Sequence, residues 1–275
     1  MVVDAEIMIG RFVLALVMLT STATLSAAND IILLHAAGSL RAALTEVAAA
    51  YQAASGDKVQ PKWGASGLLK DEIAAGGKAE VFASANMAHP QALAQAKLSG
   101  PVALFARNRL CALVRPGLAV EAATLLDKLL DPQIKVGTST PRADPSGDYA
   151  FEAFKRAEAV KAGAQVILEK KALQLTGAAN SAVPPDGRAV YGWHVAEGRA
   201  DIFLTYCTNA VEAVKENPGQ RRIDLPAPLE TGADYGLTVM NGSTMGAYRL
   251  ALFILSVEGQ RILAAHGFSA PGLAQ

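Results

Sequence analysis

The chain alternates between short runs of apolar residues and longer segments in which apolar residues recur every three or four positions. The short runs predict β-strands over residues 31–35, 59–63, 80–85, 108–114, 134–138, 165–168, 201–206 and 235–240. The helical spacing predicts α-helices over residues 40–56, 68–75, 148–162, 188–197 and 243–266. Strands that alternate with helices are typical of a mostly parallel sheet covered on both faces, so the pattern predicts an α/β protein with two such units.

The N-terminal segment carries the pattern of a secretion signal. An arginine precedes the apolar run 12–19, and small residues follow up to position 28. Ser26 and Ala28 fit the −3 and −1 positions of a signal peptidase site. The apolar run is too short to cross a bilayer of about 30 Å. We therefore expect a cleaved signal peptide at residues 1–28, whether translation starts at Met1 or Met8, and a mature chain in the periplasm.

The composition argues against two kinds of partner. Basic and acidic residues balance at 25 each, and no block of five or more Lys or Arg residues occurs, so we expect no nucleic-acid surface. The four histidines and two cysteines show no metal-ligand spacing, so we expect no bound free cation and no cofactor. In an exported protein Cys111 and Cys207 can form a disulfide, and two buried free thiols are the alternative.

Four loops that contain Gly and mostly Ser open a predicted helix, usually just after a strand. These loops are residues 37–40, 64–67, 145–148 and 185–188. A helix N-terminus presents unpaired backbone N–H groups and about half a positive charge, so it attracts anions. In an open α/β sheet such loops lie at the carboxyl ends of the strands, where ligands bind. The other interpretation is that Ser39, Ser66 and Ser146 are ordinary helix N-caps.

Catalytic motifs are incomplete in this sequence. Residues 64–67 read Gly-Ala-Ser-Gly, but a nucleophile elbow would need glycine where Leu68 stands. The chain also has no glycine-rich dinucleotide fingerprint and no phosphate-loop lysine motif. We therefore expect a binding protein and not an enzyme.

Several motifs, in their order and spacing, resemble the periplasmic molybdate-binding proteins of ABC importers. The matching segments are residues 36–40 (Ala-Ala-Gly-Ser-Leu), 63–67 (Trp-Gly-Ala-Ser-Gly), 79–85 and 265–268. The resemblance covers essentially the whole mature chain. It implies the two-lobed fold of type II periplasmic binding proteins, with a mixed sheet and flanking helices in each lobe. Lobe one would be residues 29–107 plus 239–275, and lobe two residues 108–238, joined by two crossing strands that act as a hinge.

The same resemblance implies a set of ligand-binding residues. In that family the oxyanion is held by two serine hydroxyls, a tyrosine hydroxyl and backbone N–H groups of the second lobe. The matching positions are Ser39, Ser66 and Tyr206, with Ser146 and the backbone near Arg188 in the second lobe. The guanidinium of Arg188 could also reach the ligand, or it could point to solvent. The implied ligand is molybdate or tungstate, and the implied partner is the membrane permease of an ABC importer, with the protein as a monomer.

Three positions differ from the family's usual residues. They are Asn86, which replaces an acidic residue, Ser146, which replaces alanine, and Arg188, which replaces an apolar residue. The alternative is therefore the same fold binding another anion, such as sulfate, a phosphonate or a small carboxylate. An adhesion or colonisation factor that retained the fold is a further alternative.

Overall fold

The computed structural model describes residues 31–271 of the chain, so the predicted signal peptide lies outside the described residues. In this part of the chain the strands follow the hydrogen-bonded order β2-β1-β3-β9-β4-β7-β5-β6, and β8 pairs with β4. The strand bounds are β1 Ile31–Ala37, β2 Lys58–Gly64, β3 Val81–Ser84, β4 Ala103–Val114, β5 Val136–Ser139, β6 Leu173–Thr176, β7 Ile202–Tyr206, β8 Arg221–Asp224 and β9 Gly232–Val239.

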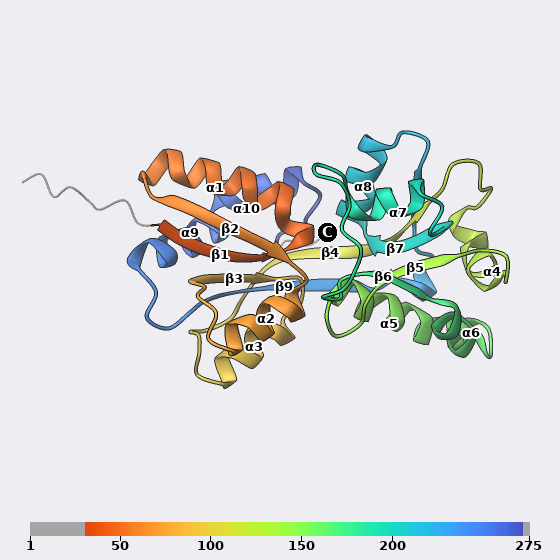
Figure 1. Cartoon of the computed structure of the whole chain (residues 1–275), viewed down its shortest axis with the longest axis horizontal. Helices are drawn as coiled ribbons and strands as arrows, with labels where there is room; N and C mark the ends of the chain where they lie inside the picture. Colours follow the sequence, from red (N-terminus) through yellow and green to blue (C-terminus); the bar gives the residue numbers. More distant parts are fainter. Residues whose placement is uncertain (1–30, 272–275) are drawn as a thin grey trace, which may run out of the picture.

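Strand β4 runs through the middle of the molecule and joins its two halves (Figure 1). Its first part, up to Arg109, pairs antiparallel with β9, which pairs in turn with β3. Its last part, from Leu110 to Val114, pairs with β7, and β8 pairs along part of the same stretch. The first half, as we use the term, contains β1, β2 and β3, and the second half contains β5 to β8.

Helices cover both faces of the sheet in each half (Figure 1). In the first half, α1 (Arg41–Ser55), α9 (Met245–Leu255) and α10 (Val257–Ala265) lie on one face, and α2 (Ser66–Ala74) and α3 (Ala88–Gln95) on the other. In the second half, α7 (Val190–Ala196) and α8 (Cys207–Glu216) oppose α5 (Pro145–Val160) and α6 (Ala164–Lys171), and α4 (Leu125–Leu130) lies at the far end. Each half has its own buried apolar clusters between strands and helices.

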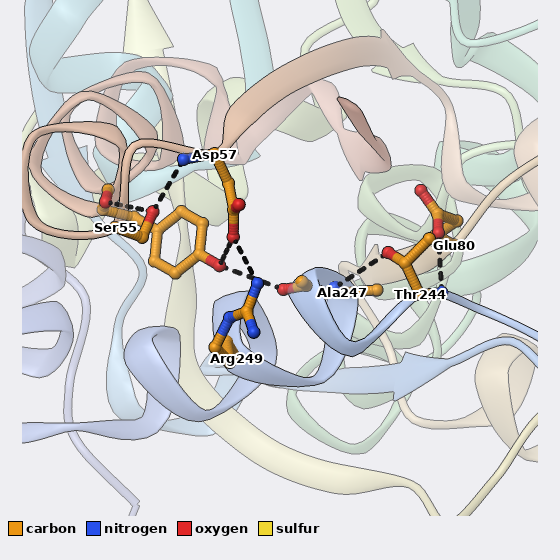
Figure 2. Close-up of polar contacts among 8 residues, drawn as sticks. Ser55, Asp57, Glu80, Thr244, Ala247 and Arg249 are labelled. Carbon is orange, nitrogen blue, oxygen red and sulfur yellow. Dashed lines mark hydrogen bonds and ion pairs between the residues drawn. The ribbon is translucent and has the colours of Figure 1, made fainter. Parts of the chain in front are cut away.

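Two carboxylates, the buried Asp57 and the half-buried Glu80, attach helix α9 to the rest of the first half, as Figure 2 shows. Asp57 is 3% exposed, and its Oδ2 accepts from the Tyr51 hydroxyl at 2.7 Å and from the Arg249 guanidinium at 2.9 Å. Glu80 accepts from the backbone N–H of Thr244 at 2.9 Å and from that of Leu33 at 3.0 Å. Because charged hydrogen bonds are among the strong ones, these contacts fix α9 against α1 and β1 although about 190 residues separate Asp57 from Arg249.

The structure contains one of the two arrangements that the sequence left open for the cysteines, the disulfide. Cys111 of β4 and Cys207, the first residue of α8, are bonded, with their Cα atoms 4.8 Å apart. Both residues are buried, and the bond joins the central strand to the helix that follows Tyr206.

The predicted strand over residues 165–168 is wrong, because this segment lies in helix α6. Its β-branched residues Val166 and Ile167 suggested a strand, yet they are 69% and 49% exposed and pack into no sheet. Helix α6 follows Gly163, whose positive φ of 81° a side chain rarely adopts. The strand comes later, as β6.

The single long helix predicted over residues 243–266 is also wrong, because the chain forms α9 and α10 with a break at Ser256. The Ser256 hydroxyl accepts from the backbone N–H of Gly259, so this serine caps a new helix where the pattern predicted continuation. Helices α3, α4 and α8 and strand β8 were not predicted. Among the described residues, no helix is long and apolar enough to cross a membrane.

Candidate anion-binding site

Ser39 and Ser66 lie where strands β1 and β2 end and the next helices begin. Ser39 belongs to the 3-10 turn Gly38–Leu40, and its hydroxyl lies 3.0 Å from the hydroxyl of Tyr235 on β9. Ser66 is the first residue of α2 and fully buried, and its Oγ accepts from the backbone N–H of Ala85 at 3.0 Å. This bond uses a lone pair of the Ser66 hydroxyl and leaves its hydrogen to be donated to a ligand.

Tyr206 belongs to the second half, and its hydroxyl lies in the same region as Ser39 and Ser66. It ends β7, is 1% exposed, and packs with the apolar cluster of the first half. Its hydroxyl donates to Ala85 O at 3.3 Å, and its ring centroid lies 5.6 Å from that of Tyr235. Burial, with smaller contributions from Tyr235 and Asp144, raises the pKa of Tyr206 well above its ordinary value, so the hydroxyl stays a donor. Ser39, Ser66 and Tyr206 therefore converge.

Ser146 lies in the first turn of α5, which begins shortly after β5 ends. Asp144 caps this helix, and its Oδ1 accepts from the backbone N–H of Ser146 at 3.1 Å. The Ser146 side chain is fully buried, and its Oγ has no hydrogen-bond partner within residues 31–271. The same holds for the hydroxyls of Thr138 and Ser139 at the end of β5. Because a buried polar group without a partner is costly, the hydroxyls of Ser139 and Ser146 are available to a ligand. Thr138 precedes Ser139 in the strand, so its side chain points to the opposite face of the sheet.

The halves touch directly beside these serines. The backbone N–H of Gly67 in α2 donates to the carbonyl of Ala143 at 2.9 Å. A Cβ at position 67 would lie 2.3 Å from Arg142 O and 2.7 Å from Ala143 O, so only glycine fits this approach. The contact brings the N-terminus of α2 next to the loop that precedes α5. The structure thus assembles four predicted residues, Ser39, Ser66, Ser146 and Tyr206, around the junction of the halves.

The side chain of Arg188 points elsewhere. Its guanidinium forms an ion pair with Glu216 at the end of α8 and a hydrogen bond of 3.3 Å with Asn217 Oδ1. Its backbone N–H donates to Pro185 O at 3.1 Å, and the N–H of Ala189 donates to Glu216 Oε2 at 2.6 Å. The structure therefore does not join Arg188 to the other four predicted residues.

Sequence reasoning did not identify Asp144, Ser139 or Tyr235 as parts of this region. The available signal for Asp144 was its place directly before Pro145, which predicts an N-cap but not a half-buried carboxyl beside buried hydroxyls. Burial raises the pKa of Asp144 to about 6, against the opposing effect of the Ser146 N–H.

A surface cavity of about 190 Å³ lies between α8 and the C-terminal segment. None of the five predicted residues lines it, although Asn108 in its lining donates to the Tyr235 hydroxyl at 3.3 Å. Because the converging hydroxyls lie at the contact between the halves, we place the candidate site there.

The sequence matches the family of bacterial extracellular solute-binding proteins over residues 32–269, and the chain belongs to this family. An uncharacterized protein of Pasteurella multocida is 32% identical over 235 residues, which are 85% of this chain and 96% of that protein. The family is one of substrate-binding proteins and not of enzymes, which confirms the expectation of a binding protein.

Solved structures with the same fold bind different solutes. The periplasmic molybdate-binding protein of Azotobacter vinelandii has a TM-score of 0.71 at 18% identity, covering 87% of this chain and 99% of that one. The sulfate-binding protein SubI of Mycobacterium tuberculosis has a TM-score of 0.72 at 18% identity, covering 88% of each chain. Peb3 of Campylobacter jejuni has a TM-score of 0.64 at 17% identity, covering 86% and 98%, and a further PEB3 structure holds L-phospholactate. These likenesses confirm the predicted periplasmic binding-protein fold but do not identify the ligand.

Proposed function

We propose that this protein captures a tetrahedral oxyanion, molybdate or tungstate, between its two halves and delivers it to the permease of an ABC importer. The observation that carries the proposal is the pair of fully buried hydroxyls on Ser139 and Ser146, which lack partners among residues 31–271, next to the convergence of Ser39, Ser66 and Tyr206. Many neutral donors aimed at one dianion can hold it without a full counter-charge, because each hydrogen bond to a charged group contributes about 1.5–3 kcal/mol.

The proposal includes export and closure. The mature chain, without residues 1–28, would act as a monomer in the periplasm. Lobe one would comprise residues 29–107 and 239–275, and lobe two residues 108–238, turning about β4 and β9. The change of partner along β4, from β9 to β7 and β8, supports this division. Hinge closure around a ligand is the usual response of periplasmic binding proteins.

A phosphonate or small carboxylate is the second candidate ligand. The Asp144 carboxyl, which accepts from the Ser146 N–H, is the observation that favours it, because an acceptor in the site suits an anion that carries its own O–H. L-phospholactate in PEB3 shows that this fold can hold a phosphorylated carboxylate.

Replacing Ser66 with alanine tests the proposed site. We expect Ser66→Ala to weaken molybdate binding by about 10- to 100-fold, since it removes a donor from a desolvated dianion. Ser99→Ala is the matched control, because Ser99 is also buried but donates to the backbone of Gly100 away from the site. Titration calorimetry measures both. Equal affinities of Ser66→Ala and the wild type would remove Ser66 from the site.

The ion pair with Glu216 gives a definite expectation for Arg188. We expect Arg188→Ala to keep the wild-type affinity for the oxyanion within about twofold, because its guanidinium is held at the end of α8. A loss of about 10-fold or more, equivalent to about 1.4 kcal/mol, would show that the side chain reaches the ligand after all.

A further inference from the structure

Asp144 occupies a place where an anion would bind. It caps α5, a helix of 16 residues, and its Oδ1 accepts the Ser146 N–H that a ligand oxygen would otherwise use. The side chains of Ser139 and Ser146 beside it are fully buried, and their hydroxyls lack partners among residues 31–271. A helix N-terminus attracts one negative charge readily, but here the protein supplies that charge itself.

The groups around Asp144 do not neutralise it. The charged side chain that acts on it is Asp148, on the same helix, and Asp148 is faced by His89 of α3 from the first half. The neutral hydroxyls of Tyr191 on α7 and Tyr206 on β7 also lie within its electrostatic reach. The pKa of Asp144 is raised to about 6, chiefly by burial, so its carboxyl is mostly ionised in the free protein above that pH.

Binding a dianion beside an ionised carboxyl is strongly unfavourable. Like charges repel more strongly near a protein than in bulk water, and the second charge of a dianion roughly doubles this repulsion. A protonated carboxyl removes the repulsion and turns an acceptor into an O–H donor. The protonated form of Asp144 therefore fits a site whose other groups are donors.

We propose that Asp144 takes up one proton from solvent when a fully deprotonated oxyanion binds, and donates this proton in a hydrogen bond to the ligand. The inference rests on the proposed function of the site. The proton adds to a carboxylate oxygen, and no bond of the oxyanion breaks. An anion that arrives with its own proton, such as monohydrogen phosphate, supplies the hydrogen of this bond itself and needs no proton from solvent.

The direction in which molybdate affinity changes with pH follows from the coupling between ligand binding and proton uptake by Asp144. Because the bound dianion raises the pKa of Asp144 above its free value of about 6, affinity for molybdate falls as pH rises from about 6 to 8, by up to about 10-fold per unit. An Asp144→Asn side chain resembles the protonated acid in shape and donor capacity. The variant should bind molybdate with the same affinity at about pH 6 and pH 8.

Titration calorimetry of the mature chain with molybdate, in two buffers of different ionisation enthalpy at about pH 8, counts the protons taken up. We expect about one proton for the wild type and for Asp148→Asn, the matched carboxyl of the same helix turn, and none for Asp144→Asn. With phosphate the wild type should take up close to none. If Asp144→Asn does not fold, the wild-type proton count and its pH dependence still decide.

The other possible results of the titration distinguish a failure of the proposed role of Asp144 from a failure of the proposed function. Molybdate binding without proton uptake, or uptake that persists in Asp144→Asn, overturns the role of Asp144 and leaves the proposed function standing. Absence of binding heat with molybdate, tungstate, sulfate and phosphate at both pH values overturns the proposed function and this inference with it.

Discussion

A Gly67→Ala protein is expected to bind its oxyanion at least about 100-fold more weakly than the wild type. The added Cβ would lie 2.3 Å from Arg142 O and 2.7 Å from Ala143 O, and both atoms are backbone that cannot rotate away. The first half would have to separate from the second, so the hydroxyls of Ser66 and Ser146 could no longer face one ligand. A loss of 100-fold corresponds to about 2.7 kcal/mol.

The effect of Gly67→Ala should be confined to binding. Separation of the halves relieves the clash in the ligand-free protein, and position 67 lies in helix α2, where alanine is favourable, so the ligand-free variant should unfold at about the wild-type temperature. Gly100→Ala is the matched control, because a Cβ there makes only an ordinary contact, 3.7 Å from Val239 O. Calorimetry would give both affinities. A Gly67→Ala affinity within about threefold of the wild type would contradict closure at this contact.

Removing the disulfide is expected to cause the largest loss of stability. The bond between Cys111 and Cys207 closes a loop with a sequence separation of 96, and a loop of about 100 residues corresponds to about 4.7 kcal/mol of chain entropy. We expect the Cys111→Ser, Cys207→Ser double variant to lose about 4–5 kcal/mol in the free energy of unfolding, measured by denaturant titration.

The reduced wild type provides the control for the disulfide. It should unfold at nearly the same denaturant concentration as the double variant, because both lack the same constraint. Since Cys207 directly follows Tyr206, the double variant should also bind the oxyanion more weakly. A loss of stability below about 1 kcal/mol would show that tertiary packing alone holds β4 to α8.

The sequence predicts the place of a site residue where that place depends on the strand and the helix next to it in the chain. Ser39 and Ser66 each follow a strand and open a turn or helix, so their place at the carboxyl ends of β1 and β2 could be predicted. Tyr206 and Ser146 were identified through the family resemblance. Their convergence depends on the antiparallel pairing of β4 with β7 and on the Gly67 contact, which no local pattern encodes.

The errors have the same origin in tertiary context. Val166 and Ile167 favoured a strand by β-propensity, but no neighbouring strand was available to bury them and α6 formed instead. For Arg188 the resemblance left two positions of the guanidinium open, at the ligand or toward solvent, and the sequence could not decide between them because the side chain pairs with Glu216, 28 residues later. Asp144 matched an ordinary N-cap, and only its half-buried place beside the buried hydroxyls of Ser139 and Ser146 distinguishes it.

The most direct test of anion capture is thermal unfolding of the mature chain with about 1 mM molybdate, tungstate, sulfate or phosphate at about pH 6.5. A ligand present at about 100 times its Kd stabilises the folded state by about 2.7 kcal/mol. We predict that molybdate and tungstate raise the Tm clearly, and that sulfate and phosphate raise it less or not at all. A shift with sulfate alone would retain the mechanism and change the ligand, and an unchanged Tm with all four anions would contradict oxyanion capture itself.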